Sequence, residues 1–79
     1  MRFGWPTEML LDLGWTPLRT ARFWAGMSQD ELAEIVGSSR ETISSLERRA
    51  SIPSVTLALA IARALDTSVE ELFVTRELD

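Results

Sequence analysis

Two short helices joined by a tight turn are encoded by residues 28–48, and this arrangement constrains the fold more than any other stretch. Ser28 is followed three residues later by Glu31, which is the spacing of a capping box that begins a helix. Apolar residues then recur at helical spacing, at Leu32, Ala33, Ile35 and Val36. Gly37 can end this helix, because the residue after a helix often adopts a left-handed conformation, and glycine has no β-carbon to clash there.

The second helix of the pair begins at Ser38 or Ser39 and has a much thinner apolar side. Only Ile43 and Leu46 are apolar between residues 39 and 48. A steep crossing of two helices after so short a turn tolerates only a small side chain, and Ala33 supplies one. The remaining surface of the second helix is polar, so we expect its outer side to face a binding partner.

These residues, with others along the chain, resemble the helix-turn-helix domain of lambdoid phage repressors and Cro, which small XRE-type bacterial regulators share. The resemblance extends from about Leu18 to Phe73. The positions that match in register are Leu18, Arg22, Gly26, Ser28, Gln29, Glu31, Leu32, Ala33, Gly37, Ser39, Thr42, Ile43, Ser44, Glu47, Pro53, Ser54, Ile61, Ala62, Leu65 and Ser68. The resemblance implies an all-α, compact bundle of about five short helices, with the helix-turn-helix at about residues 28–48. Residues 16–79 are then the domain, and residues 1–15 are an N-terminal extension that departs from the family pattern.

The rest of the chain can be divided into helices by the same signals. Thr16 and Pro17 begin a helix whose buried side we expect to include Ala21 and Ala25, and Gly26 ends it. Ser54 begins a later helix with a core stripe that we expect Val55 and Leu59 to widen; its main members are Leu57, Ile61, Ala62 and Leu65. Ser68 with Glu71 forms a further capping box that opens a last short helix.

The linker over residues 49–53 carries one apolar residue that we expect to anchor it, Ile52. Family members often have glycine near position 49. This chain has Arg49 there, which leaves the shape of the loop open.

The residues that the chain lacks exclude most enzyme chemistry. The 79-residue sequence contains no His, Cys, Lys or Tyr. The usual general bases, thiol nucleophiles, Schiff-base amines and zinc ligands are therefore absent. We expect no enzymatic activity, no cofactor and no metal site. No apolar run is long enough to span a membrane and no signal-peptide pattern is present, so we expect a cytoplasmic protein, associated with the nucleoid when bound.

The net charge of −4 needs an explanation, since nucleic-acid-binding domains are usually basic. Residues 16–50 hold five arginines and five acidic residues, whereas residues 51–79 hold two arginines and five acidic residues. The arginines thus gather around the helix-turn-helix. This distribution predicts weak non-specific affinity of a single protomer for DNA.

The resemblance also implies roles for individual side chains. Base contacts in the major groove are implied for Arg40, Glu41 and Ser45, with Ser44 as a lesser candidate. Phosphate contacts are implied for Gln29, Ser39, Thr42, Arg48 and Arg49. An ion pair is implied between Arg22 in the first helix and Glu47 in the recognition helix. For Arg40 and Glu41 the alternative is an ordinary solvated helix start, and for Arg49 it is solubility alone.

The implied function is sequence-specific binding of double-stranded DNA by a transcriptional repressor, with residues 39–48 as the recognition helix. We expect a homodimer that reads half-sites about one turn apart (~34 Å). The alternative is a protein-interaction module on the same fold, such as an antitoxin-like or accessory factor. Residues 1–15 would serve either as a lid on the core or as a contact with a dimer partner or another protein, because Phe3, Trp5 and Trp15 are costly to expose.

Overall fold

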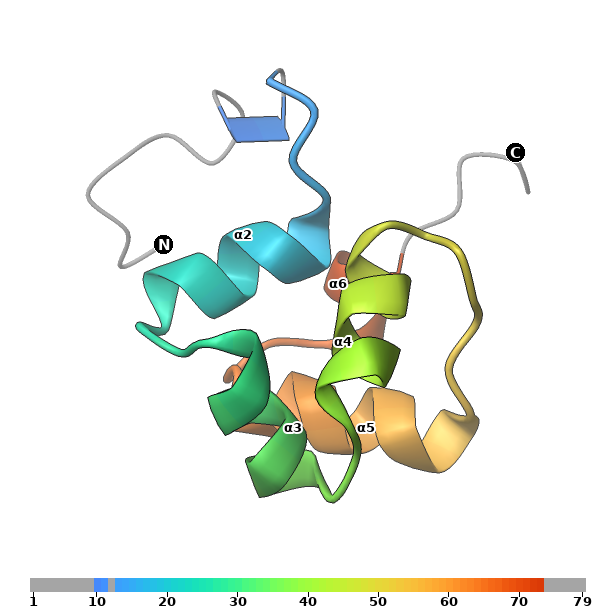
Figure 1. Cartoon of the computed structure of the whole chain (residues 1–79). Coiled ribbons are helices and arrows are strands. Elements are labelled where there is room, and N and C mark those ends of the chain that lie inside the picture. The colour runs from blue at the N-terminus through green and yellow to red at the C-terminus, as the bar shows by residue number, and fades with distance from the viewer. Residues whose placement is uncertain (1–9, 12, 74–79) are drawn as a thin grey trace.

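A computed structural model of the chain describes residues 10–11 and 13–73. Within these residues the helices are α2 (Pro17–Trp24), α3 (Gln29–Val36), α4 (Arg40–Glu47), α5 (Val55–Ala64) and α6 (Val69–Leu72) (Figure 1). No strand occurs in this part of the chain, and the expected all-α bundle is confirmed. Most of the proposed N-terminal extension, and the segment after residue 73, lie outside the described residues.

Each helix begins with a hydroxyl side chain that caps it. The caps are Thr16, Ser28, Ser39, Ser54 and Ser68, and each hydroxyl accepts a hydrogen bond of 3.0–3.3 Å from the amide three residues later. At α3 the capping box is complete, because the Ser28 amide also donates to the Glu31 carboxylate at 2.8 Å. At α6 the expected box is only half formed, since the carboxylate of Glu71 accepts from the Thr67 hydroxyl (2.5 Å) instead.

Four helices end in the same way, with a left-handed residue in a Schellman motif. The residues in this conformation are Gly26, Gly37, Arg49 and Asp66, with φ between 57° and 74°. The amide of each of these residues donates to the carbonyl three residues before it. The amide of the following residue donates to the carbonyl five residues before itself, and all these bonds measure 2.8–3.3 Å. The two glycines were predicted from the sequence. Arg49 resolves the open question of the linker, because it adopts the glycine-type conformation despite its β-carbon.

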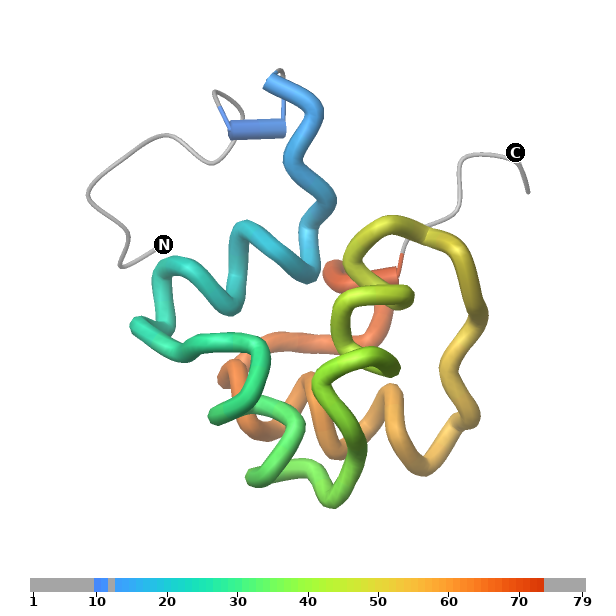
Figure 2. The backbone as a smooth tube through the Cα atoms, in the orientation of Figure 1, coloured from blue at the N-terminus to red at the C-terminus, as the bar shows by residue number. Residues whose placement is uncertain are grey.

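The core is built where α3 meets α4 and α5, and where α2 packs against α4 and α6 (Figure 2). Four aliphatic side chains at its centre are almost fully buried, namely Leu18, Leu32, Ile43 and Ile61. Ala33 is also buried, as expected for the small residue of the helix-turn-helix pair. Ile43 and Leu46 belong to this core, so burial of its thin apolar side keeps α4 in contact with the other helices.

Four apolar residues that we expected to pack in the core are exposed instead. The exposed fractions are 58% for Ile35, 93% for Ile52, 77% for Val55 and 44% for Leu59. The buried arc of α5 is narrower than expected and consists of Ala58, Ile61 and Ala62, followed by Leu65. Val55 lies in the first turn of α5 and Leu59 at the edge of this arc. Ile52 does not anchor the linker, which bows away from the helices in a wide arc (Figure 2).

The first helix, α2, also differs from the expected pattern in one detail. Ala25, expected on the buried side, is exposed, whereas Thr20 is buried. The helix ends at Trp24, so Ala25 lies in the turn toward Gly26, beyond the packed surface.

Candidate nucleic-acid interface

Helix α4 carries two stripes of residues with the same spacing on opposite sides. The buried stripe is Ile43, Leu46 and Glu47. The opposite stripe consists of Glu41, Ser44, Ser45 and Arg48, of which the two serines are half-buried and the charged residues exposed. Arg40 is exposed at the first helical position. The side chains implied for base contact therefore lie together on the outer side of α4.

The N-terminal end of α4 is held by two hydroxyl groups. Ser39 Oγ accepts from the Thr42 amide at 3.1 Å and lies 2.9 Å from Thr42 Oγ1. The two side chains thus stabilise the start of the helix. They also lie at the end of α4 from which Arg40 and Glu41 project.

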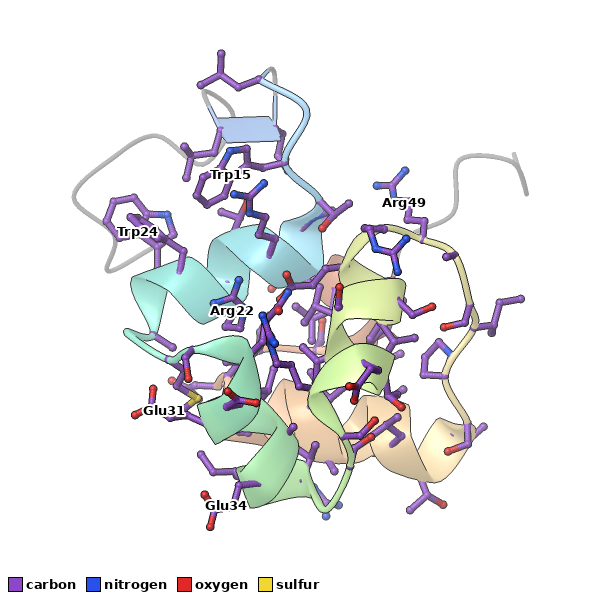
Figure 3. The ribbon with its side chains drawn as sticks, in the orientation of Figure 1. Trp15, Arg22, Trp24, Glu31, Glu34 and Arg49 are labelled. Atoms are coloured by element: carbon purple, nitrogen blue, oxygen red, sulfur yellow. The ribbon has the colours of Figure 1, made fainter. Side chains whose placement is uncertain are left out.

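The carboxylate of Glu47 is the most heavily bonded polar group near this surface. Arg22 donates to it through Nε (2.5 Å) and Nη2 (3.2 Å), while Arg22 Nη1 donates to the Met27 carbonyl at 2.8 Å. The exposed fractions of the two side chains are 15% for Arg22 and 4% for Glu47. Figure 3 shows Arg22 beside α4, between α2 and α3. Removing only one member of a buried carboxylate–arginine pair is costly, because the remaining charge stays buried without a partner.

Gln29 joins the same cluster, which sequence reasoning did not foresee. Its amide Nε2 donates to Glu47 Oε1 at 3.0 Å. An amide nitrogen carries two protons, so one remains for another acceptor such as a phosphate oxygen. The cluster of Arg22, Gln29 and Glu47 therefore connects α2, α3 and α4.

Two further residues extend the surface beyond the C-terminal end of α4. Arg48 and Arg49 are both exposed, and Figure 3 shows Arg49 past the end of α4, whereas Glu31 and Glu34 lie on α3 at the far side of the pair. Arg48 and Arg49 thus lie away from Glu31 and Glu34, whereas Arg40 stands beside Glu41 at the start of α4.

A second bond that the sequence did not predict links α4 to the linker. Ser45 Oγ donates to Ser51 Oγ at 3.0 Å, and the Ala50 amide donates to the Ser45 carbonyl at 2.9 Å. Neither this bond nor that of Gln29 has a sequence signal, because serine and glutamine are common and their spacing follows no rule.

Over residues 10–11 and 13–73 there is no group of three acidic, cysteine or histidine side chains that could hold a metal ion. No helix there is long and apolar enough to cross a membrane.

Comparison with known proteins gives consistent matches over the region just described. A family profile described as helix-turn-helix matches residues 18–72. Three relatives are named as uncharacterised HTH-type transcriptional regulators. One from Archaeoglobus fulgidus is 46% identical over 59 residues, which cover 75% of this chain and 84% of the relative. One from Methanothermobacter thermautotrophicus is 44% identical over 63 residues, covering 78% and 91%. YgzD from Bacillus subtilis is 40% identical over 57 residues, covering 72% and 83%.

The ion pair between Arg22 and Glu47 can be tested by a double-mutant cycle. Arg22→Met alone and Glu47→Leu alone should each lower the free energy of unfolding by roughly 3–5 kcal/mol, because each strands the other charge. The double variant should recover much of this loss, since two apolar side chains leave no buried charge. Urea or thermal melts of the four proteins measure the coupling. As a control, Arg19→Met and Glu34→Leu change exposed residues of the same types and should cost under about 1 kcal/mol each. Additive losses of that small size at Arg22 and Glu47 would contradict a buried pair.

Proposed function

Because this chain belongs to the helix-turn-helix family of DNA-binding transcription regulators, we propose that it binds a specific double-stranded DNA sequence with α4 in the major groove and represses transcription there. The observation that carries the proposal is the outer stripe of α4, where Glu41, Ser44 and Ser45 form a polar surface between two arginines. Repression requires only that a bound protein occupy the site. The buried side of the same helix fixes its orientation.

The outer stripe supports a concrete scheme for reading bases. Arg40 can donate two hydrogen bonds to O6 and N7 of guanine, and Glu41 can accept one from N4 of cytosine. Ser45 directs its proton to Ser51. In that arrangement Ser45 accepts rather than donates, which favours the amino group of adenine or cytosine. Ser44 adds a short polar contact beside it.

The residues proposed for the phosphates surround this stripe. Gln29 has one amide proton left after its bond to Glu47. Ser39 and Thr42 place hydroxyls at the start of α4, and Arg48 and Arg49 follow its end. Asp30 and Glu31, in the first turn of α3, oppose these contacts because their negative charge repels the DNA phosphates. The binding of one protomer is therefore weak, and we propose a homodimer on two half-sites.

The base-reading role of Arg40 can be separated from phosphate binding by two substitutions. Arg40→Ala should lose roughly 1–3 kcal/mol of specific binding and relax the preference at one base position. Gln29→Ala should weaken binding to all sequences alike. Selection of bound sites from random DNA, repeated with each variant, measures both. Arg19→Ala removes the same charge from the exposed surface of α2 and should leave the selected sites unchanged. An unaltered site profile for Arg40→Ala would show that this side chain reads no base.

The left-handed conformation of Arg49 allows stability and function to be tested against each other. A β-carbon in this conformation costs about 1–2 kcal/mol. Replacing Arg49 by glycine removes this strain, but part of the gain is lost because glycine also gives the unfolded chain a larger entropy. Arg49→Gly should therefore raise the free energy of unfolding by up to about 1 kcal/mol, and yet weaken DNA binding. Asp66→Gly is the matched control, because Asp66 has the same conformation at the end of α5. It should leave DNA binding unchanged. If both variants bind DNA like the parent protein, Arg49 has no phosphate role.

The salt dependence of binding distinguishes this function from a protein-interaction module on the same fold. With a few arginines of each protomer at phosphates or bases, log affinity should fall with log salt at a slope of about −3 to −6. Electrophoretic mobility shift or fluorescence titration of a selected site between low and physiological salt gives the slope. A slope near zero, together with salt-independent co-purification of another protein, would favour the protein-interaction module.

A further inference from the structure

One serine of the outer stripe of α4 is paired with a serine of the linker. Ser45 Oγ donates to Ser51 Oγ at 3.0 Å. Ser45 is half-buried on α4, whereas Ser51 is exposed just after the helix. Where Ser39 meets Thr42, either hydroxyl can be the donor, but in this pair the donor is Ser45. The pair therefore has a direction, with the Ser45 proton pointing to the linker.

The end of α4 brings Ser51 to this place. Arg49, in its left-handed conformation, reverses the chain after the helix. Its amide donates to the Leu46 carbonyl at 3.1 Å, and the Ala50 amide donates to the Ser45 carbonyl at 2.9 Å. The backbone of Ser45 is thus bonded to the residue just before Ser51. This bond holds the two hydroxyl groups together, although they are six positions apart in the sequence.

A serine hydroxyl without a fixed partner reads bases ambiguously. Its proton rotates, so the group can donate to a carbonyl of guanine or thymine, or accept from an amino group of adenine or cytosine. Ser45 has one such proton, and it is directed to Ser51. Only the lone pairs of the Ser45 oxygen are then left for DNA. They attract amino groups and repel carbonyl oxygens, so the selectivity of Ser45 depends on a residue outside the recognition helix.

We propose that Ser51 is a positioning residue that determines the base specificity of Ser45. The proposal rests on the DNA-binding function proposed above, and it adds one residue of the linker to those that set the preferred sequence. With Ser51 in place, Ser45 selects adenine or cytosine over guanine or thymine at one base position. Without Ser51, the Ser45 hydroxyl is free to donate as well, and the selectivity is lost while the contact itself remains.

Bound DNA reinforces the direction of this pair. Ser51 keeps its own proton when it accepts from Ser45, and its side chain is exposed. Arg48 and Arg49, the proposed phosphate contacts, precede Ser51 by three and two residues. A phosphate oxygen only accepts hydrogen bonds. A phosphate at this end of α4 therefore draws the Ser51 proton toward itself and leaves the Ser51 oxygen to accept from Ser45.

The test compares selectivity instead of affinity. Sites selected from random DNA by the parent protein and by Ser45→Ala identify the base position that Ser45 reads, since its preference disappears in that variant. Fluorescence titration of duplexes with each of the four bases at this position gives the ratio of affinities for amino bases (adenine, cytosine) to carbonyl bases (guanine, thymine). A loss of stability, or of a phosphate contact, weakens binding to all sequences alike and cancels in this ratio.

The parent protein should favour adenine or cytosine at this position. Ser51→Ala should lower the ratio roughly two- to tenfold, the factor that one hydrogen bond contributes. Ser51→Thr keeps the hydroxyl group and should keep the parent's ratio. Thr56→Ala is the control, because it removes an exposed hydroxyl from the first turn of α5 and should leave the ratio unchanged.

The outcomes distinguish this inference from the proposed function. If the ratio falls in Ser51→Ala but not in Ser51→Thr, Ser51 sets the selectivity of Ser45. If Ser51→Ala keeps the parent's ratio, if Ser51→Thr loses it as well, or if the parent favours guanine or thymine there, the inference is wrong while DNA binding stands. The same holds if Ser45→Ala selects the same sites as the parent. If the parent selects no site, the function and the inference are both wrong.

Discussion

The buried carboxylate of Glu47 is the group on which the arrangement of the helices depends most. A carboxylate that is only 4% exposed is stable only if its charge is compensated, and Arg22 and Gln29 supply that compensation from two other helices. The apolar side of α4 is too thin to define its angle alone, because Ile43 and Leu46 permit some rotation about the helix axis. Directional hydrogen bonds from two sides remove that freedom. The same cluster therefore fixes the orientation of the outer stripe, which we propose reads DNA, and restricts the direction from which Gln29 can reach a phosphate.

The two ends of α4 are stabilised in different ways, and the difference bears on function. At its start, Ser39 satisfies a free amide at no cost to the backbone. At its end, Arg49 completes a Schellman motif in a conformation that glycine adopts more easily. The chain uses glycine at the equivalent places after α2 and α3. Asp66 has the same conformation after α5, so a residue other than glycine at this place is no sign of function by itself. Arg49 does place a long, exposed cationic side chain just after α4, where we propose that it contacts a DNA phosphate.

An acidic protein can bind DNA if its charges are separated, and this chain shows how the separation arises. Exposed arginines flank α4, whereas many of the acidic residues lie on α3 and around α6. The attraction that one protomer can offer DNA is therefore small, and we propose that directed contacts from the outer stripe of α4 supply the specificity.

The sequence by itself determined where the helices begin and end, because capping is local. Ser28 and Gly37 lie within a few residues of the groups that they satisfy, and the structure has both as expected. The tertiary structure alone decided which apolar side chains are buried. Val55 and Leu59 look like core residues on a helical projection, yet the neighbouring helices cover only the arc beside them. It also decided the bond between Gln29 and Glu47, which are 18 residues apart, whereas the pair of Arg22 and Glu47 was expected from the family resemblance and not from any local pattern. No periodicity encodes such a pairing, which depends on how whole helices pack.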